Sequence, residues 1–188
     1  MLDLVKQETE RLDSRFLEPA CGDGNFLIEV LNRKLETLVK KYKRNQYEFE
    51  RNSVVIVGSI YGIDILEDNA QLAKERIFSR FIEVYEKHFK EHLNNNLIKS
   101  IKFILDKNII HGDALTLKQV GSDNPVTFCE WAVIKNKIKR RDFTLSDLLV
   151  YAPFEKGTLF SDAGDEVIIP DPIKEYSLVK YDEAFKSC

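Results

Sequence analysis

The order of apolar patterns along the chain constrains the fold more than any other feature. Three short runs at 15–18, 53–65 and 108–111 carry the apolar and β-branched residues typical of strands. Between them lie two long segments, from Asn25 and around Leu72, whose apolar residues recur every three to four positions as in helices. Strands that alternate with helices predict an α/β fold, in which a parallel sheet is flanked by helices and connected by right-handed crossovers.

The pattern is less regular between these elements. A helix is expected over 2–12. The helix from Asn25 is expected to give way to a charged loop over 40–52, before a strand that begins at Ser53. The run Asn94–Asn96 is expected to end the second long helix.

A different pattern follows Asp113. Residues 126–134 and 138–143 read as two strands joined by a turn at Asn136–Lys137, which predicts an antiparallel hairpin. Thr144 is a suitable cap for a short helix over 145–150.

The domain organisation follows from where these patterns stop. Beyond Tyr151 the chain is rich in proline and glycine and offers one strand candidate, 167–169. We therefore expect one domain over 1–150, with a loop-rich extension of the same domain over 151–188.

Composition excludes several classes of protein. The chain of 188 residues has a formal net charge of −3, so no global positive field draws it to nucleic acid or to a membrane. Its three cysteines are odd in number and widely spaced, which argues against a disulfide framework and favours the reducing cytoplasm. No apolar stretch approaches the roughly 20 residues needed to span a bilayer. The amino terminus lacks the apolar core of a signal peptide.

The segment Leu17–Phe26 carries the strongest functional signal. Gly22 and Gly24 lie between a strand end and a helix start, where glycine lets the backbone approach a ligand that a side chain would block. Asp64 ends the next strand, where a carboxylate can accept both ribose hydroxyls of a nucleoside. Asp113 ends the third strand and could accept a hydrogen bond from an adenine amine. These positions together predict a nucleoside-containing ligand.

The spacing departs from the simple dinucleotide-binding rule. Asp64 lies 42 positions after Gly22, whereas a short crossover places the acid about 20 residues on. We assign the excess to a longer helix and the charged loop expected over 40–52. The order of strands and helices is unchanged, so Asp64 is still expected to be the ribose-binding acid.

These residues resemble a known family. Residues 16–25 look like the first motif of the S-adenosylmethionine-dependent, amino-group-specific DNA methyltransferases of restriction–modification systems, which reads Asp/Glu-Pro-Ala-Cys-Gly-x-Gly. Residues 62–68 are similar to the second motif of that family and 111–115 to the third. The resemblance extends over roughly residues 4–115. It implies a Rossmann-like methyltransferase fold, S-adenosylmethionine as cofactor and an adenine-specific DNA methyltransferase activity.

The resemblance also implies where the cofactor binds. Glu18, Ala20 and Gly22 would line its methionine end, with Gly24 and Asn25 at the start of the adjoining helix. Asp64 would hold the ribose, Ile65 would flank the adenine, and Asp113 with Ala114 would contact its polar edge. The full set of implied cofactor-binding residues is Glu18, Pro19, Ala20, Cys21, Gly22, Gly24, Asn25, Phe26, Asp64, Ile65, Asp113 and Ala114.

The acceptor half of the site is missing from the sequence. The family holds the flipped base with an Asn/Asp-Pro-Pro-aromatic turn, whose polar groups accept from the amine and whose ring stacks on the base. The nearest match, Asn124-Pro125-Val126, has one proline and no aromatic residue, and reads better as an ordinary turn that opens a strand. We therefore assign no catalytic residue, and expect a second protein subunit to supply the acceptor site for a nucleic acid, DNA rather than RNA.

Two alternatives stay open. In one, the chain is a non-catalytic subunit or remnant that holds the cofactor and regulates a nuclease or methylase partner. In the other, the substrate is RNA, because adenine methylation of either polymer needs a site that polarises the exocyclic amine.

Other chemistry-bearing residues favour structural roles. His88 and His92 have the spacing of a two-histidine metal face, but no third ligand stands out, so no metal site is expected. Trp131 fits core packing better than base stacking. The basic run 135–141 could grip phosphates or could protect a solvated edge strand. Cys21 is expected to be a small packing residue and not a nucleophile.

Overall fold

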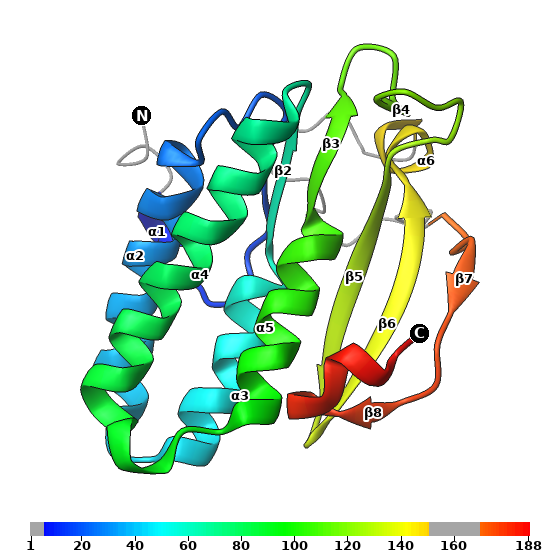
Figure 1. Cartoon of the computed structure of the whole chain (residues 1–188). Helices are drawn as coiled ribbons and strands as arrows, with labels where there is room; N and C mark the ends of the chain where they lie inside the picture. The colour runs from blue at the N-terminus through cyan, green and yellow to red at the C-terminus, as the bar shows by residue number, and fades with distance from the viewer. Residues whose placement is uncertain (1–5, 151–169) are drawn as a thin grey trace.

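The computed structural model describes residues 6–150 and 170–188 of the chain (Figure 1). The helices are α1 (Lys6–Glu10), α2 (Asn25–Tyr42), α3 (Gln46–Val57), α4 (Glu67–Phe89), α5 (Asn95–Asn108) and α6 (Leu145–Val150), with short 3-10 helices η2 (Lys90–His92) and η3 (Tyr181–Lys186). The strands are β1 (Phe16–Glu18), β2 (Ile60–Asp64), β3 (Ile109–Asp113), β4 (Lys118–Gln119), β5 (Thr127–Ile134), β6 (Lys137–Thr144), β7 (Lys174–Glu175) and β8 (Val179–Lys180).

The first sheet has the order β1-β2-β3-β4, so β2 is flanked by β1 and β3. Both of these neighbours run parallel to it, whereas β4 is antiparallel to β3. The prediction of an α/β fold built on a parallel sheet is confirmed. The second sheet is antiparallel, with β6 paired to β5, β7 and β8.

The two faces of β2 belong to two apolar clusters. Ile60 packs in the larger cluster, together with buried side chains of the helices α2 to α5 that lie along one side of the sheet (Figure 1). Tyr61 and Ile63 face the other way and pack with Val126, Phe128 and Leu145. This alternation is the pleat of a strand that is buried on both faces.

The prediction of a loop over 40–52 and a strand from Ser53 is wrong. Residues 46–57 form α3, whose first turn is capped by the Asn45 side chain accepting from the Glu48 N–H at 3.1 Å. The β-branched residues Val54 and Val57 are fully buried inside this helix. Their packing against the helical layer overrides a strand preference that is weak on its own.

A second helix was missed between β2 and β3. Asn94 does follow α4, but its side chain also accepts from the N–H groups of Asn96 and Leu97 at 3.0 and 3.3 Å. It is therefore the N-cap of α5, and the asparagine run begins a helix as well as following one. The chain crosses from β2 to β3 through two helices, α4 and α5.

The predicted hairpin and short helix are confirmed by β5, β6 and α6. The hydroxyl of Thr144 accepts from the Asp147 N–H at 3.1 Å, as expected of a cap. The strand predicted at 167–169 lies outside the described residues. None of the described helices has the length and apolar character needed to cross a membrane.

The basic run does not form an edge strand, since β6 has partners on both sides. Arg140 is buried and forms two 2.8 Å hydrogen bonds with Asp142, and Arg141 pairs with Glu130. Lys139 lies 2.9 Å from Glu175. Because three of its cations have carboxylate partners, this run is largely structural.

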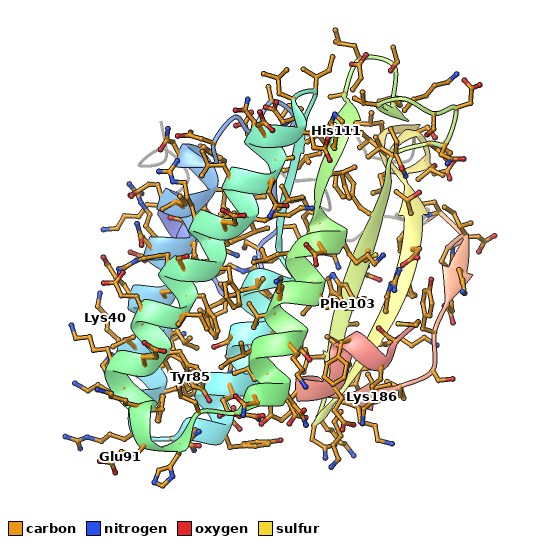
Figure 2. The ribbon with its side chains drawn as sticks, viewed as in Figure 1. Lys40, Tyr85, Glu91, Phe103, His111 and Lys186 are labelled. Atoms are coloured by element: carbon orange, nitrogen blue, oxygen red, sulfur yellow. The ribbon has the colours of Figure 1, made fainter. Side chains whose placement is uncertain are left out.

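A buried carboxylate joins the end of the described chain to the helical layer. Glu50 of α3 accepts from the hydroxyls of Tyr85 in α4 and Tyr181 in η3 at 2.5 and 3.1 Å. Its oxygens also accept from the side-chain amides of Gln46 and Asn94. Tyr85 is fully buried, and Figure 2 shows it toward the opposite end of the molecule from His111.

Asn108 links the two sheets through buried hydrogen bonds. It accepts from the indole N–H of Trp131 at 2.9 Å and donates to the carbonyls of Gly58 and Ile60. This contact, with 7% exposure for Trp131, confirms the core assignment of that residue.

We expect Asn108→Ala to lower the free energy of unfolding by about 2–4 kcal/mol, because it leaves several buried polar groups without a partner. Urea denaturation followed by the fluorescence of the single tryptophan, Trp131, measures the effect. The control Asn95→Ala, at the exposed start of the same helix, should change stability by less than about 0.5 kcal/mol. Equal values for the two variants would contradict the role of Asn108.

Candidate cofactor site

Three predicted acids lie at one edge of the parallel sheet. Glu18, Asp64 and Asp113 are the last residues of β1, β2 and β3. Since these strands are parallel neighbours, their carboxyl ends meet at the same edge, which is where α/β sheets bind ligands. Figure 2 labels His111 in β3 near this edge.

The turn after β1 is tied directly to the end of β2. The N–H of Cys21 donates to the Ile63 carbonyl at 2.8 Å, and the N–H of Gly22 donates to the Asp64 carboxylate at 2.7 Å. Gly24 closes the turn with a 2.9 Å bond to the Cys21 carbonyl and is the N-cap of α2. The first two sequence motifs are therefore one physical unit.

The two glycines of this turn have different surroundings. Gly22 has φ +52° and Gly24 has φ +87°, both in the left-handed region that disfavours side chains. A Cβ on Gly24 would lie 3.0 Å from the Cβ of Ala73 in α4, whereas a Cβ on Gly22 would meet nothing within 4 Å. Gly24 is thus needed for packing, and Gly22 faces open space.

The Asp64 carboxylate is held by three donors. Besides Gly22, the N–H of Leu66 and the side chain of Asn69 donate to it at 2.9 and 3.1 Å. Desolvation by burial would raise the pKa of Asp64, which is 8% exposed, but these hydrogen bonds outweigh it and lower the pKa below its ordinary value. A carboxylate offers about four acceptor positions, so this ionised group keeps capacity for a further donor.

An arginine that the sequence analysis missed also holds this turn. Arg76 of α4 pairs with the Asp23 carboxylate at 2.6 Å and donates to the Asp23 carbonyl at 2.8 Å. It further donates to the Asn25 side chain at 2.9 Å. Asn69, another missed residue, lies in the first turn of the same helix. No local spacing rule relates Arg76 to a turn more than 50 positions earlier, so sequence reasoning had no signal for this residue. Asn69 follows Asp64 by five positions, so its contact is local and only the position of the helix start could have indicated it.

The third acid organises the loop after β3. Asp113 accepts from the N–H groups of Leu115 and Thr116 at 2.8 and 3.4 Å, and these bonds lower its pKa. Ala114 packs against the smaller apolar cluster, on the side of the sheet away from α2. Ile65 is 58% exposed, and its carbonyl lies 3.1 Å from His111 Nε2. An exposed apolar side chain beside Asp64 suits contact with a flat ring.

The other predicted residues fall on the same turn. Glu18 accepts from the Ala20 N–H at 3.4 Å, and both Pro19 and Ala20 are exposed. Phe26 packs partly against the larger apolar cluster. Cys21 is buried, and desolvation raises the pKa of its thiol to about 12, so it packs as a neutral side chain. Its atoms would lie 3.1 Å from a Cβ on Gly62, which explains a glycine in the middle of β2.

The rejected candidates also have defined places. Asn124 is exposed and its carbonyl accepts from the Gln119 N–H at 2.9 Å, as in an ordinary turn between β4 and β5. His88 lies in α4 and His92 in η2. Within residues 6–150 and 170–188, no cluster of three or more His, Cys, Asp or Glu side chains could hold a metal ion.

Comparisons with known proteins agree with the sequence motifs. Residues 3–122 match the model of the MmeI DNA-methyltransferase domain family. A stretch of 84 residues, 43% of this chain, is 30% identical to a Methanocaldococcus jannaschii protein described as a type II restriction enzyme and methyltransferase, and spans 7% of that protein. No solved structure matches the chain. Since the family model covers more than half of its length, the chain belongs to the MmeI DNA-methyltransferase domain family, and its resemblance to the DNA methyltransferases of restriction–modification systems is confirmed.

Proposed function

We propose that this chain is the S-adenosylmethionine-binding part of an adenine-specific DNA methyltransferase of a restriction–modification system. The proposal includes a Rossmann-like methyltransferase fold, a cytoplasmic location and the domain division at residue 150. Family membership supports methyl transfer to DNA, and the finer points rest on the geometry of the turn and strand ends.

One observation carries the proposal. The open space at Gly22, the ionised Asp64 carboxylate and the exposed Ile65 side chain lie together at the carboxyl edge of the sheet. A nucleoside needs this combination: close backbone approach, an acceptor for ribose hydroxyls, and an apolar contact for the base. The residues present therefore fit the cofactor.

The cofactor, when bound, supplies an electrophilic sulfonium methyl group. The chain's own residues would orient it: Asp64 would accept from the ribose hydroxyls, and Glu18 at the end of β1 would lie toward the amino-acid end. Asp113 and the backbone of Ala114 would meet the polar edge of the adenine. The Asp23–Arg76 pair would keep the turn in place while the ligand exchanges.

The free edge of β1 supports an acceptor site supplied by another segment or subunit. In the described residues β1 pairs only with β2, although in doubly wound sheets the first strand is central and a further strand pairs with its other side. Beside β1, an apolar cavity of about 40 Å³ is lined by Leu17, Tyr61, Phe128 and Leu148. A strand added here parallel to β1 would have its carboxyl end next to Glu18.

A non-catalytic role stays the second candidate, favoured by the absence of an Asn/Asp-Pro-Pro-aromatic turn from the sequence. Under that role the chain would bind the cofactor and regulate a partner. RNA as the substrate is a third possibility that the same acceptor chemistry allows.

Cofactor binding tests the proposal. Calorimetry should show S-adenosylmethionine and its demethylated product binding to the purified chain, and Asp64→Ala should weaken both at least about tenfold, because charge-assisted hydrogen bonds to the ribose are lost. Asp123→Ala is the matched control, since it removes the same charge from a side chain that is 97% exposed. Equal affinity of the Asp64→Ala and Asp123→Ala proteins would remove Asp64 from the site.

A further inference from the structure

Lys34 is a buried charged side chain with no part in the site described above. It lies in the middle of α2 and has 0% exposure. Burial lowers the pKa of its ammonium to about 7, so keeping this group inside the protein costs stability that an apolar side chain would not. A buried ammonium is tolerated only where polar groups surround it, so its contacts show what it holds together.

The contacts of Lys34 account for all of its donors. The Nζ atom donates to the carbonyls of Leu12 and Ser14 at 3.2 and 2.5 Å, and to the hydroxyl oxygen of Ser59 at 2.8 Å. Ser59 uses its own proton to bond the Ile56 carbonyl at 2.6 Å, so its oxygen is free to accept. Three N–H groups therefore meet three oxygens, which is the arrangement an ammonium satisfies in full.

The charged groups that face Lys34 come from one segment. Glu8, Arg11 and Asp13, in and after α1, act on its charge, with Asp13 and Glu8 opposing the effect of burial. From the sheet side it meets the neutral Ser59 hydroxyl, and the Phe16 ring lies 5.3 Å from Nζ.

These oxygens lie just before the two strands that carry the first two motifs. Ser14 lies two residues before β1 and Ser59 immediately precedes β2, where its carbonyl accepts from the Phe16 N–H at 2.9 Å. β1 is only three residues long and, among the residues that the structure describes, pairs with β2 alone, so it has few ladder bonds. Lys34 therefore anchors β1 and β2 to each other at one end, while the Gly22–Asp64 bond joins them at the other.

We propose that Lys34 is a positioning residue for the cofactor site: it fixes the amino-terminal ends of β1 and β2, and so sets where Gly22 and Asp64 lie relative to each other. This rests on the proposed function, because the consequence that matters is cofactor affinity. The set of Lys34 contacts with Leu12, Ser14 and Ser59, here called the clamp, can be tested without any ligand.

The test compares three variants of the whole chain. Lys34→Met removes the donors and keeps a long apolar side chain, and Ser59→Ala removes one acceptor only. Glu50→Gln is the control, since it perturbs a buried polar network at the far end of the helical layer, away from both strand starts.

Two measurements decide the outcome. By calorimetry, Lys34→Met should weaken S-adenosylmethionine binding at least about tenfold and Ser59→Ala about threefold, while Glu50→Gln stays within about twofold of the wild type even if its melting temperature falls. By NMR hydrogen exchange without ligand, the Gly22 amide should exchange faster in Lys34→Met and Ser59→Ala, but not in Glu50→Gln.

The results separate the two proposals. Unchanged affinity and unchanged Gly22 exchange in a folded Lys34→Met protein would overturn the positioning role, as would an equal loss in Glu50→Gln. If Lys34→Met does not fold, cofactor affinity and Gly22 amide exchange measured on Ser59→Ala decide whether the positioning role holds. A wild-type chain that binds no S-adenosylmethionine would contradict the proposed function alone, because the exchange experiment would still test the clamp.

Discussion

Gly22→Val is expected to abolish the rise in melting temperature that S-adenosylmethionine gives the wild-type chain. The new side chain would enter the open space beside the turn, where the cofactor has to lie against the backbone. Ligand at about a hundred times its dissociation constant stabilises a protein by about 2.7 kcal/mol, so the lost shift is easily measured. The variant itself should fold, with a cost of about 1–2 kcal/mol for the left-handed backbone.

Two glycine controls make this result specific. Gly121→Val carries the same type of strain at φ +78° with nothing within 4 Å, but lies in the loop between β4 and β5, so its cofactor shift should match the wild type. Gly24→Val should lower the melting temperature far more, with or without ligand, because its side chain collides with Ala73 of α4. A full cofactor shift in Gly22→Val would mean that this glycine serves only the turn.

The purified chain alone is expected to transfer methyl groups to DNA at a rate close to background. No Asn/Asp-Pro-Pro-aromatic turn follows Asp113 in the sequence, so no identified group would accept from the base amine or stack on the flipped base. Losing one preorganised polar contact slows a reaction by about a hundred- to a thousandfold, and here no residue of an acceptor site is identified.

Tritiated S-adenosylmethionine with mixed bacterial DNA or RNA measures this transfer. Adding the product of a neighbouring gene should restore incorporation if that protein carries the acceptor site, and DNA should be preferred over RNA. Saturable incorporation by the chain alone would contradict the expectation. Asn124, which is exposed in the turn before β5, would then be the first residue to replace.

Sequence reasoning worked where chemistry is local. The glycine turn and the acids Asp64 and Asp113 could be placed at strand ends because each follows directly from an apolar run. The hairpin and the Thr144 cap were predictable for the same reason. That these residues bind the cofactor stays a prediction.

Tertiary packing explains two of the failures, and a local ambiguity explains the third. Val54 and Val57 look like strand residues, and only their burial in the helical layer makes a helix favourable. The N-cap role of Asn94 was masked because asparagine both ends and begins helices. Arg76 reaches the turn across the α2–α4 contact, which no single segment of sequence reveals.

The burial of Cys21 makes its thiol poorly reactive toward oxidants and alkylating reagents. Thiols react as thiolates, and burial raises the pKa of both Cys21 and Cys129 to about 12, so neither is a ready target for peroxide or alkylating reagents. Cys188 is the exposed thiol of the chain. A maleimide dye should therefore attach at Cys188 and leave the turn unmodified, giving a single-site label for watching ligand exchange in real time.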